Sequence, residues 1–256
     1  RCPMPIRYAR RLTGRRRTAI ANRHLGFALA FVAGAINAGG FLAVQQYTSH
    51  MTGIVSAMAD NIALGAYPLV LSGLGGVLSF LLGAICSTKM VSYARRRRMH
   101  SVNALPLLFE AFLLLCFGFL GATLASIDGL FVPLTVMLLC FIMGLQNALI
   151  TKLSRAEIRT THITGIVTDI GIELGKLFYW NRRKVGHQIG VVADRQRLRV
   201  LALLGLYFFL GGLAGAFGFN RLGYSATVPL ALLLVALASV PALDDLRSLL
   251  RRLQRG

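Results

Sequence analysis

The chain has 256 residues, of which 55% are hydrophobic and only 14% are charged, and its net charge is +19. A soluble domain carries nearer a quarter charged residues, so this composition excludes an ordinary soluble protein. The positive charge would favour a nucleic-acid partner in a soluble chain. Here the arginine runs lack interleaved aromatic residues, and no nucleic-acid binding is expected.

The chain opens with a basic arm, residues 1–23, which we expect to lie on the anionic headgroups of a lipid bilayer. Six long apolar runs follow, and each is close to the ~20 residues that cross a hydrocarbon core as a helix. They are Leu25–Val44, Pro68–Val91, Ala104–Ala125, Leu130–Ile150, Leu198–Phe219 and Tyr224–Leu243. The last segment, 244–256, has leucines at helical spacing among arginines, which predicts an interfacial amphipathic helix.

A duplicated motif divides the chain into two halves. The stretch 50–56, His-Met-Thr-Gly-Ile-Val-Ser, returns at 162–168 as His-Ile-Thr-Gly-Ile-Val-Thr, which indicates that one unit was duplicated. Each copy comes with three predicted spans, so the second half (127–243) enters the membrane upside down relative to the first (24–126). We therefore predict an all-α integral membrane protein with six transmembrane helices as a 3+3 inverted repeat, a recurrent transporter design.

The basic residues predict the orientation of these spans. With the N-terminus in the cytoplasm, every Lys and Arg except Arg221 falls on the cytoplasmic side, as the positive-inside rule requires. Both termini and the second motif copy are then cytoplasmic, and the first motif copy is external. An alternative with eight crossings, in which both motif segments also span, would put Arg95–Arg98 outside and is disfavoured.

Both motif copies are predicted to be amphipathic helices, because their apolar residues recur at helical spacing. Hydroxyl groups at the start of each copy suit the N-terminus of a helix, where they can cap free N–H groups. Each helix either lies flat on its membrane surface or is re-entrant, with its polar face lining a cavity at membrane depth. In the re-entrant arrangement the positive helix end favours an anion, and the candidate substrate-binding residues are His50, Thr52, Gly53, His162, Thr164 and Gly165. The two histidines either contact a ligand or bind a proton, or are structural residues held by hydrogen bonds.

Polar side chains inside the predicted spans are further candidates. Asn37, Gln146 and Asn147 form hydrogen bonds between helices or contact a substrate. Glu110 is well inside a span, where a carboxylate is costly and its default interpretation is functional; it either couples transport to a proton or ion, or pairs with the cluster Arg95–Arg98. Asp169 and Glu173 are one turn apart and either take part in coupling or form ion pairs with nearby arginines.

No enzyme activity, cofactor or metal site is expected. The chain has no G-x-S-x-G nucleophile motif, no HExxH zinc motif and no Walker loop. The four cysteines, Cys2, Cys86, Cys116 and Cys140, form no CxxC pair and are interpreted as small packing residues.

Several polar patterns together resemble one known family. They are Asn37-Ala38-x-x-Phe41-Leu42, His50-Met51-Thr52-Gly53, Gly144-x-Gln146-Asn147-Ala148 and Thr160-Thr161-x-x-Thr164-Gly165-x-x-Thr168-Asp169. They look like the YoaK-like family of bacterial multi-pass membrane proteins, a domain of unknown function sometimes labelled a small-metabolite transporter. The resemblance implies a bacterial inner-membrane location. The family usually has Asp at Asn37 and Asn at Ile54, so any role of those two residues in relatives is not implied here.

The expected function is the transport of a small polar or anionic solute by alternating access. The alternative is a non-transporting scaffold or regulatory protein that docks a partner through its basic cytoplasmic face. The expected partners are the lipid bilayer and a small-molecule solute, and association into a homo-oligomer is left open.

Overall fold

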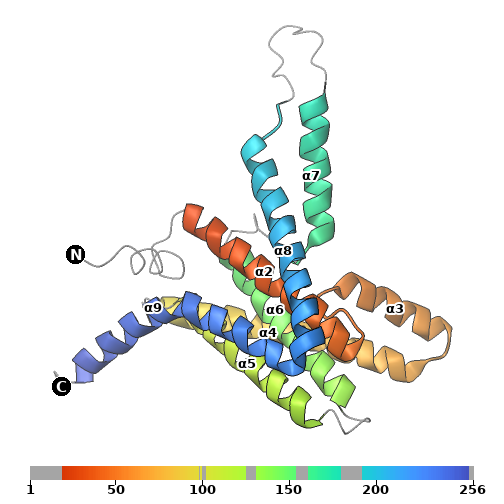
Figure 1. Ribbon diagram of the computed structural model, residues 1–256, viewed down its shortest axis with the longest axis horizontal. Coiled ribbons are helices and arrows are strands. Elements are labelled where there is room, and N and C mark those ends of the chain that lie inside the picture. Colours follow the sequence, from red (N-terminus) through yellow and green to blue (C-terminus); the bar gives the residue numbers. More distant parts are fainter. Residues whose placement is uncertain are drawn as a thin grey trace.

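The computed structural model describes residues 19–97, 99, 102–124, 131–153, 161–179 and 192–253, and all regular structure in these ranges is helical (Figure 1). The first half contains α2 (Ala19–Val44), α3 (Met51–Ala63), α4 (Tyr67–Arg96) and α5 (Ala104–Leu124). The second half contains α6 (Phe131–Leu153), α7 (Ile163–Phe178), α8 (Arg195–Leu222), the 3-10 helix η1 (Gly223–Ala226) and α9 (Thr227–Leu253). The all-α prediction is confirmed for this part of the chain.

Long apolar helices dominate the fold, because a helix satisfies its own backbone hydrogen bonds in lipid. In the described ranges, five helical stretches are long and apolar enough to cross a membrane: Arg23–Val44, Tyr67–Arg96, Ala104–Gly121, Leu134–Lys152 and Arg195–Ser239. The first four coincide with predicted spans. The fifth has 45 residues and covers all of the predicted span Leu198–Phe219 and most of Tyr224–Leu243, because η1 continues the helical backbone from α8 into α9.

α2 of the first half packs along α8 of the second half, and the pair is joined through glycines. A Cβ atom on Gly34 would collide with the backbone carbonyl of Phe208, and one on Gly211 would collide with the carbonyl of Phe31. Glycines allow two helix backbones to approach this closely in lipid, where close packing holds helices together. The contact therefore depends on a glycine from each helix.

α4 of the first half packs along α6 of the second half in the same way. A Cβ atom on Gly144 would collide with the carbonyl of Phe80, and one on Gly83 would collide with the carbonyl of Phe141. The two glycine contacts repeat those of α2 and α8 with the halves exchanged. Likewise, α3 of the first half packs on α4, and its counterpart α7 in the second half packs on α8.

η1 forms the corner between α8 and α9, where Gly223 adopts a φ of 57°. Next to this corner the rings of Phe117, Phe219 and Tyr224 pack together, with centroids 5.7–6.5 Å apart, and join α5 to α8. Beyond the corner α9 packs along α5 and continues as one helix to Leu253. The predicted tail helix is thus an extension of the last apolar helix.

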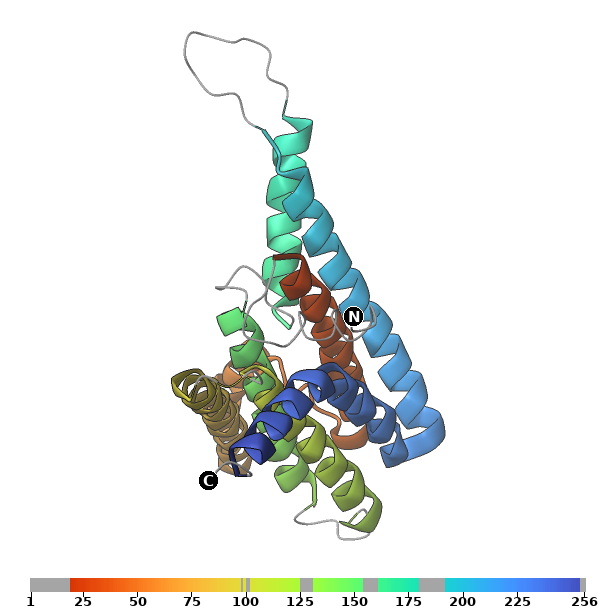
Figure 2. The ribbon, with the colours of Figure 1, turned by 90° about the vertical axis from the view of Figure 1, so that its left-hand side faces the viewer.

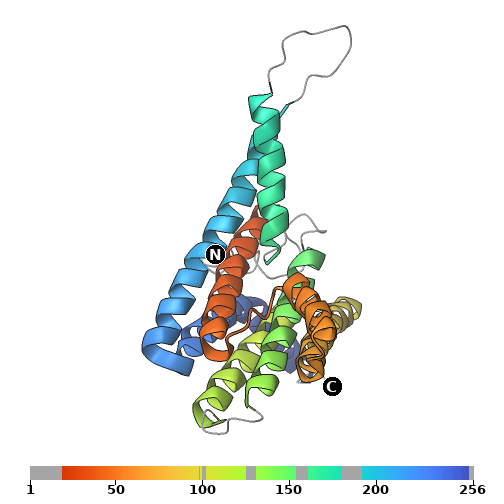
Figure 3. The ribbon, with the colours of Figure 1, turned by 90° about the vertical axis from the view of Figure 1, so that its right-hand side faces the viewer.

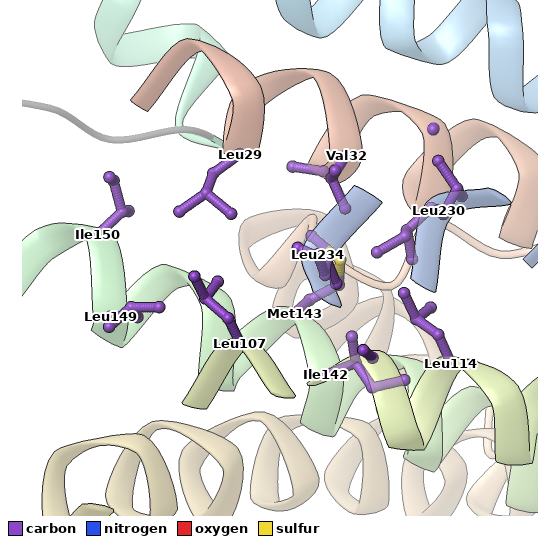
Figure 4. Close-up of a cluster of buried hydrophobic side chains, with 14 of the residues drawn as sticks. Leu29, Val32, Leu107, Leu114, Ile142, Met143, Leu149, Ile150, Leu230 and Leu234 are labelled. Atoms are coloured by element: carbon purple, nitrogen blue, oxygen red, sulfur yellow. The ribbon is translucent and has the colours of Figure 1, made fainter. Parts of the chain in front are cut away.

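The centre of the molecule is a cluster of apolar side chains where α2, α5, α6 and α9 meet (Figure 4). Its fully buried members include Leu29 and Val32 from α2, Leu107 and Leu114 from α5, Ile142, Met143, Leu149 and Ile150 from α6, and Leu234 from α9. By contrast, α7 and the first part of α8 lie side by side and project away from the other helices in all three ribbon views (Figures 1, 2 and 3).

Candidate functional site

After α2 the chain turns back along the helix it has just left. Gln45 has a positive φ of 54°, which reverses the backbone. Tyr47 then stacks on Phe41, with ring centroids 4.5 Å apart, and the Oγ atom of Ser49 donates a 2.8 Å hydrogen bond to Oδ1 of Asn37. Because Asn37 lies two turns before the end of α2, the segment that carries the first motif is pulled inward along α2.

The second half holds its motif in the same way. The Oγ1 atom of Thr161 donates a 2.6 Å hydrogen bond to Oδ1 of Asn147, and Nδ2 of Asn147 donates to the carbonyl of Met143 at 2.8 Å. Ser49 and Thr161 each come directly before a motif histidine. Asn37 and Asn147 were predicted either to form hydrogen bonds between helices or to contact a substrate. In the structure they bond instead to the short segments that lead into the motif helices.

His50 and His162 are the N-cap residues of α3 and α7, with nearly equal backbone angles (φ −92°, ψ 67° and φ −86°, ψ 61°). Neither helix receives a side-chain hydrogen bond at its N-terminus, so the predicted capping by hydroxyl groups is wrong. Instead each imidazole lies over the glycine three residues later, where a Cβ atom on Gly53 or Gly165 would collide with Nδ1 of its histidine. The His-x-x-Gly spacing thus has a packing reason.

Each motif helix begins beside the middle of the long helix that follows it and ends near the start of that helix. Ile54 lies over Gly76, nine residues into α4 and so ~14 Å from its start. Ile166 lies over Gly205, ten residues into α8 and so ~15 Å from its start. Both isoleucines are buried. The N-terminal ends, which carry the positive end of the helix dipole, therefore point toward the interior of the bundle.

The polar side chains at these ends are accessible. His50, Thr52, His162 and Thr164 are exposed, and the two glycines beneath the imidazoles are half-buried. The structure thus brings each set of predicted motif residues together at one helix end, with its asparagine directly behind. Ser49 was not among the candidates; the signal for it was the hydroxyl residue that precedes both histidines.

Asp169 and Glu173 lie further along α7, away from its N-terminal end. They form ion pairs with basic residues, which is one of the two roles predicted for them. Glu173 is buried and accepts hydrogen bonds of 2.9 Å from Nζ of Lys176 and from the backbone N–H of Asp194. The hydrogen bond from Lys176, followed by the one from Asp194, holds the pKa of Glu173 below its usual value. Arg197 pairs with Asp169 at 3.1 Å, so the network joins α7 to the start of α8.

Glu110 and Gln146 lie in the apolar centre of the molecule, and neither is exposed to any extent. Nε2 of Gln146 donates to the carbonyl of Leu29 in α2 at 3.3 Å, which confirms a hydrogen bond between helices. Both carboxylate oxygens of Glu110 and the Oε1 atom of Gln146 lack a hydrogen-bond partner in the described part of the chain. The predicted pairing of Glu110 with arginine is therefore not found for Arg95, Arg96 or Arg97; Arg98 lies outside the described residues.

These features define an α-helical multi-pass membrane protein with buried polar side chains at its centre. The chain belongs to the family described as a protein of unknown function (DUF1275), whose model matches residues 25–240. It is 30% identical over 158 residues to the UPF0700 transmembrane protein YoaK of Bacillus subtilis (strain 168), a match covering 61% of this chain and 69% of that protein. No solved structure matches the chain. The predicted YoaK-like family is confirmed.

Proposed function

We propose that the protein transports a small polar or anionic metabolite across the bacterial inner membrane by alternating access between two inverted halves. The observation that carries the proposal is the exchanged packing, in which α2 with α8 and α4 with α6 make the same glycine contacts. Inverted repeats of this kind alternate access by rocking one unit against the other around a central site. Two equivalent interfaces between the halves supply the surfaces for such a movement.

The inverted arrangement requires six crossings. The stretch Arg195–Ser239 has 45 residues and would be ~68 Å long as a straight helix, whereas the hydrocarbon core is ~30 Å thick. Two crossings that meet at the η1 corner account for this length and give three crossings in each half. Because three is odd, the second half is then inverted. The distribution of Lys and Arg supports cytoplasmic termini.

The proposed substrate site lies between the inward ends of the two motif helices. Unpaired N–H groups and the helix dipole favour an anionic group there, and the exposed side chains of His50, Thr52, His162 and Thr164 supply further hydrogen bonds. Discontinuous helices whose N-termini point at a central substrate are a recurrent transporter arrangement. Gly53 and Gly165 contribute by making room for the imidazoles, and Asn37 and Asn147 by holding the segments in place.

A flux assay in proteoliposomes tests the proposal. The full chain is reconstituted and screened with a panel of radiolabelled amino acids, carboxylates and phosphate esters under imposed pH and sodium gradients. We expect uptake of at least one anionic solute, and a loss of about tenfold or more in Thr52→Val and Thr164→Val, equivalent to ~1.4 kcal/mol. The matched control is Gly171→Ala, a position in α7 with open space around it, which should transport normally. No flux of any solute under any gradient would count against the proposal.

A scaffold or regulatory role is the second candidate, and the projecting pair of α7 and α8 favours it. Near the outer end of this pair Phe178, Tyr179 and Val192 are 60–79% exposed, which is unusual for apolar side chains outside a membrane. A scaffold would tolerate Thr52→Val and Thr164→Val, but not Phe178→Asp, in an assay for a co-purified partner. The flux assay with the same variants separates the two candidates.

A further inference from the structure

Glu110 lies where a charged side chain is least expected. Its neighbours on the same face of α5, Leu107, Ala111 and Leu114, are at most 1% exposed, and Leu107 and Leu114 point into the central cluster (Figure 4). The facing helices α2, α6 and α9 add further fully buried apolar side chains there. An ionised carboxylate without a partner in such surroundings is very costly, so the side chain is held in its neutral, protonated form.

Gln146 borders the same cluster from α6, which packs on α5, at the level of Glu110 along the two helices. Glu110 is 14 residues before the end of α5 and Gln146 is 15 residues after the start of α6, which is ~21 Å and ~22 Å along two packed helices that run in opposite directions. The helical neighbours of Gln146, Ile142, Met143, Leu149 and Ile150, all belong to the cluster in Figure 4. Because Nε2 of Gln146 is committed to α2, its Oε1 atom is free to accept a hydrogen bond from α5.

Few other titratable groups come near this pair. α6 contributes the buried thiol of Cys140, and η1 contributes Tyr224, which packs two turns further along α5 against Phe117. α9 has no titratable residue between Thr227 and Leu243. The titratable residues of α2 and α4 whose side chains are described are exposed or half-buried: Arg23, His24, Tyr67, Cys86, Lys89, Tyr93, Arg95 and Arg96.

We infer that Glu110 and Gln146 form a proton-binding site in the centre of the bundle, in which the carboxyl O–H of Glu110 donates to Oε1 of Gln146. Loading the site converts the carboxylate and a proton into the neutral acid, and unloading reverses this. A neutral acid matched to an amide oxygen needs no counter-ion, unlike a carboxylate. Release of the proton follows from movement of the helices. Gln146 is hydrogen-bonded to α2, so a shift of α2 and Gln146 relative to α5 would separate the O–H donor of Glu110 from its acceptor.

This inference rests on the proposed transport function in one respect: if the protein is a transporter, the proton bound at Glu110 is its coupling ion. Gln146 joins α6 to α2, and these helices belong to the two pairs that carry the exchanged glycine contacts. The rocking movement that opens one side and closes the other would therefore act directly on the Glu110–Gln146 pair. The protonation state and the direction of opening would then change together.

Infrared difference spectroscopy on the purified full chain tests the site without any solute. A protonated carboxyl group has a carbonyl stretching band well separated from those of ionised carboxylates. We expect this band at neutral pH in the unmodified protein, its absence in Glu110→Gln, and a frequency shift in Gln146→Met. Glu173→Gln is the matched control and should keep the band, because Glu173 is paired with Lys176 and Arg197.

Absence of the band at neutral pH, or its persistence in Glu110→Gln, would overturn the inference. Titration with sodium against choline at constant ionic strength separates a proton from a metal cation. Loss of the band on adding sodium would mean that the carboxylate binds sodium and would also overturn it, whereas an unchanged band supports it. Thermal unfolding verifies that Glu110→Gln, which matches the neutral acid in shape, still folds. A band without solute flux in proteoliposomes would leave the proton site standing and reject only the proposed transport.

Discussion

At the scale of single residues, Asn37 and Asn147 are the side chains that decide where the two motifs lie. Each uses its Oδ1 atom to accept a hydrogen bond from a hydroxyl group that precedes a histidine, at 2.8 Å and 2.6 Å. A carboxylate offers the same acceptor in the same position. An Asp at this position, which the resemblance to the YoaK-like family implies for relatives, would therefore keep the same local geometry.

Substitution of Asn37 separates geometry from charge. Asn37→Asp should keep the bond to Ser49 and leave thermal unfolding unchanged, whereas Asn37→Leu removes the acceptor and should cost about 1 kcal/mol. Ser49→Ala removes only the shorter of the two hydrogen bonds to Oδ1, because the backbone N–H of Ser49 also donates to it at 3.4 Å, so its cost should not exceed that of Asn37→Leu. The double variant should add little to Asn37→Leu, because the two side chains share one hydrogen bond. The measurement is differential scanning fluorimetry of the purified chain in detergent. Fully additive losses in the double variant would contradict a shared bond.

At the scale of helices, the fold depends on glycines at the two interfaces between the halves: Gly34, Gly211 and Gly215 between α2 and α8, and Gly83 and Gly144 between α4 and α6. Each glycine faces a backbone carbonyl of the neighbouring helix, which cannot move aside as a flexible side chain can. The requirement is local, because the residue next to a critical glycine can have ordinary space. Gly211 and Gly212 are such a pair.

Alanine substitutions at Gly211 and Gly212 should therefore differ. Gly211→Ala places a methyl group against the carbonyl of Phe31 and should destabilise the chain by about 1–3 kcal/mol. Gly212→Ala places its methyl group 3.7 Å from Cβ of Ala38, an ordinary contact, and should be neutral or slightly stabilising. Thermal unfolding of both variants under the same conditions tests this. Equal melting temperatures for the two would show that α2 and α8 do not pack at this point.

The α7–α8 pair is held differently from α3 and α4. α3 is joined to α4 by a three-residue turn at 64–66, whereas α7 is fastened to α8 by the ion pairs of Asp169 and Glu173. Asn61 occupies in the first motif helix the place that Glu173 occupies in the second. The α7–α8 pair therefore has pH-sensitive ion pairs that have no counterpart between the described residues of α3 and α4.

The pH dependence of the Glu173 ion pairs has a definite sign. Because the pKa of Glu173 is lowered below 4.5 in the folded protein, its contribution to stability is present above that value. The contribution is lost as the pH falls through the folded-state pKa. The difference in melting temperature between the unmodified protein and Glu173→Gln should thus be largest near neutral pH and shrink in acid below 4.5. Asp60→Asn, at an exposed site in α3 with no ion pair in the described ranges, is the control and should show no such trend.

At the scale of the whole molecule, the proposed inversion predicts the compartments that the outer ends of the two motif helices face. Leu64 and Tyr179 follow the C-terminal ends of α3 and α7, away from the proposed site, and are 79% and 60% exposed. In a variant without the four native cysteines, Leu64→Cys and Tyr179→Cys should react with a membrane-impermeant maleimide from opposite sides of an oriented vesicle. We expect Leu64→Cys to label from outside and Tyr179→Cys only in inverted vesicles. Labelling of both from one side would mean that the halves are parallel, and would remove the basis for alternating access.

The sequence by itself determined the helical class, the long apolar helices, the duplication and the family. Each follows from local information: continuous apolar runs require helices in lipid, and a repeated motif is visible without coordinates. The places where α3 and α7 begin were predicted for the same reason, since the motif marks the start of the apolar stripe.

Only the tertiary structure decided which helices meet and which polar groups find partners. The packing of α2 on α8 and of α4 on α6 does not follow from the spacing of residues in the sequence. The contact of Asn37 with Ser49 does not follow from it either, because both depend on where the chain returns in space. The sequence left two roles open for Glu110, Asp169 and Glu173. Packing gave Asp169 and Glu173 basic partners on α7 and α8, and left Glu110 among apolar side chains, since the arrangement of the helices sets the environment of a carboxyl group.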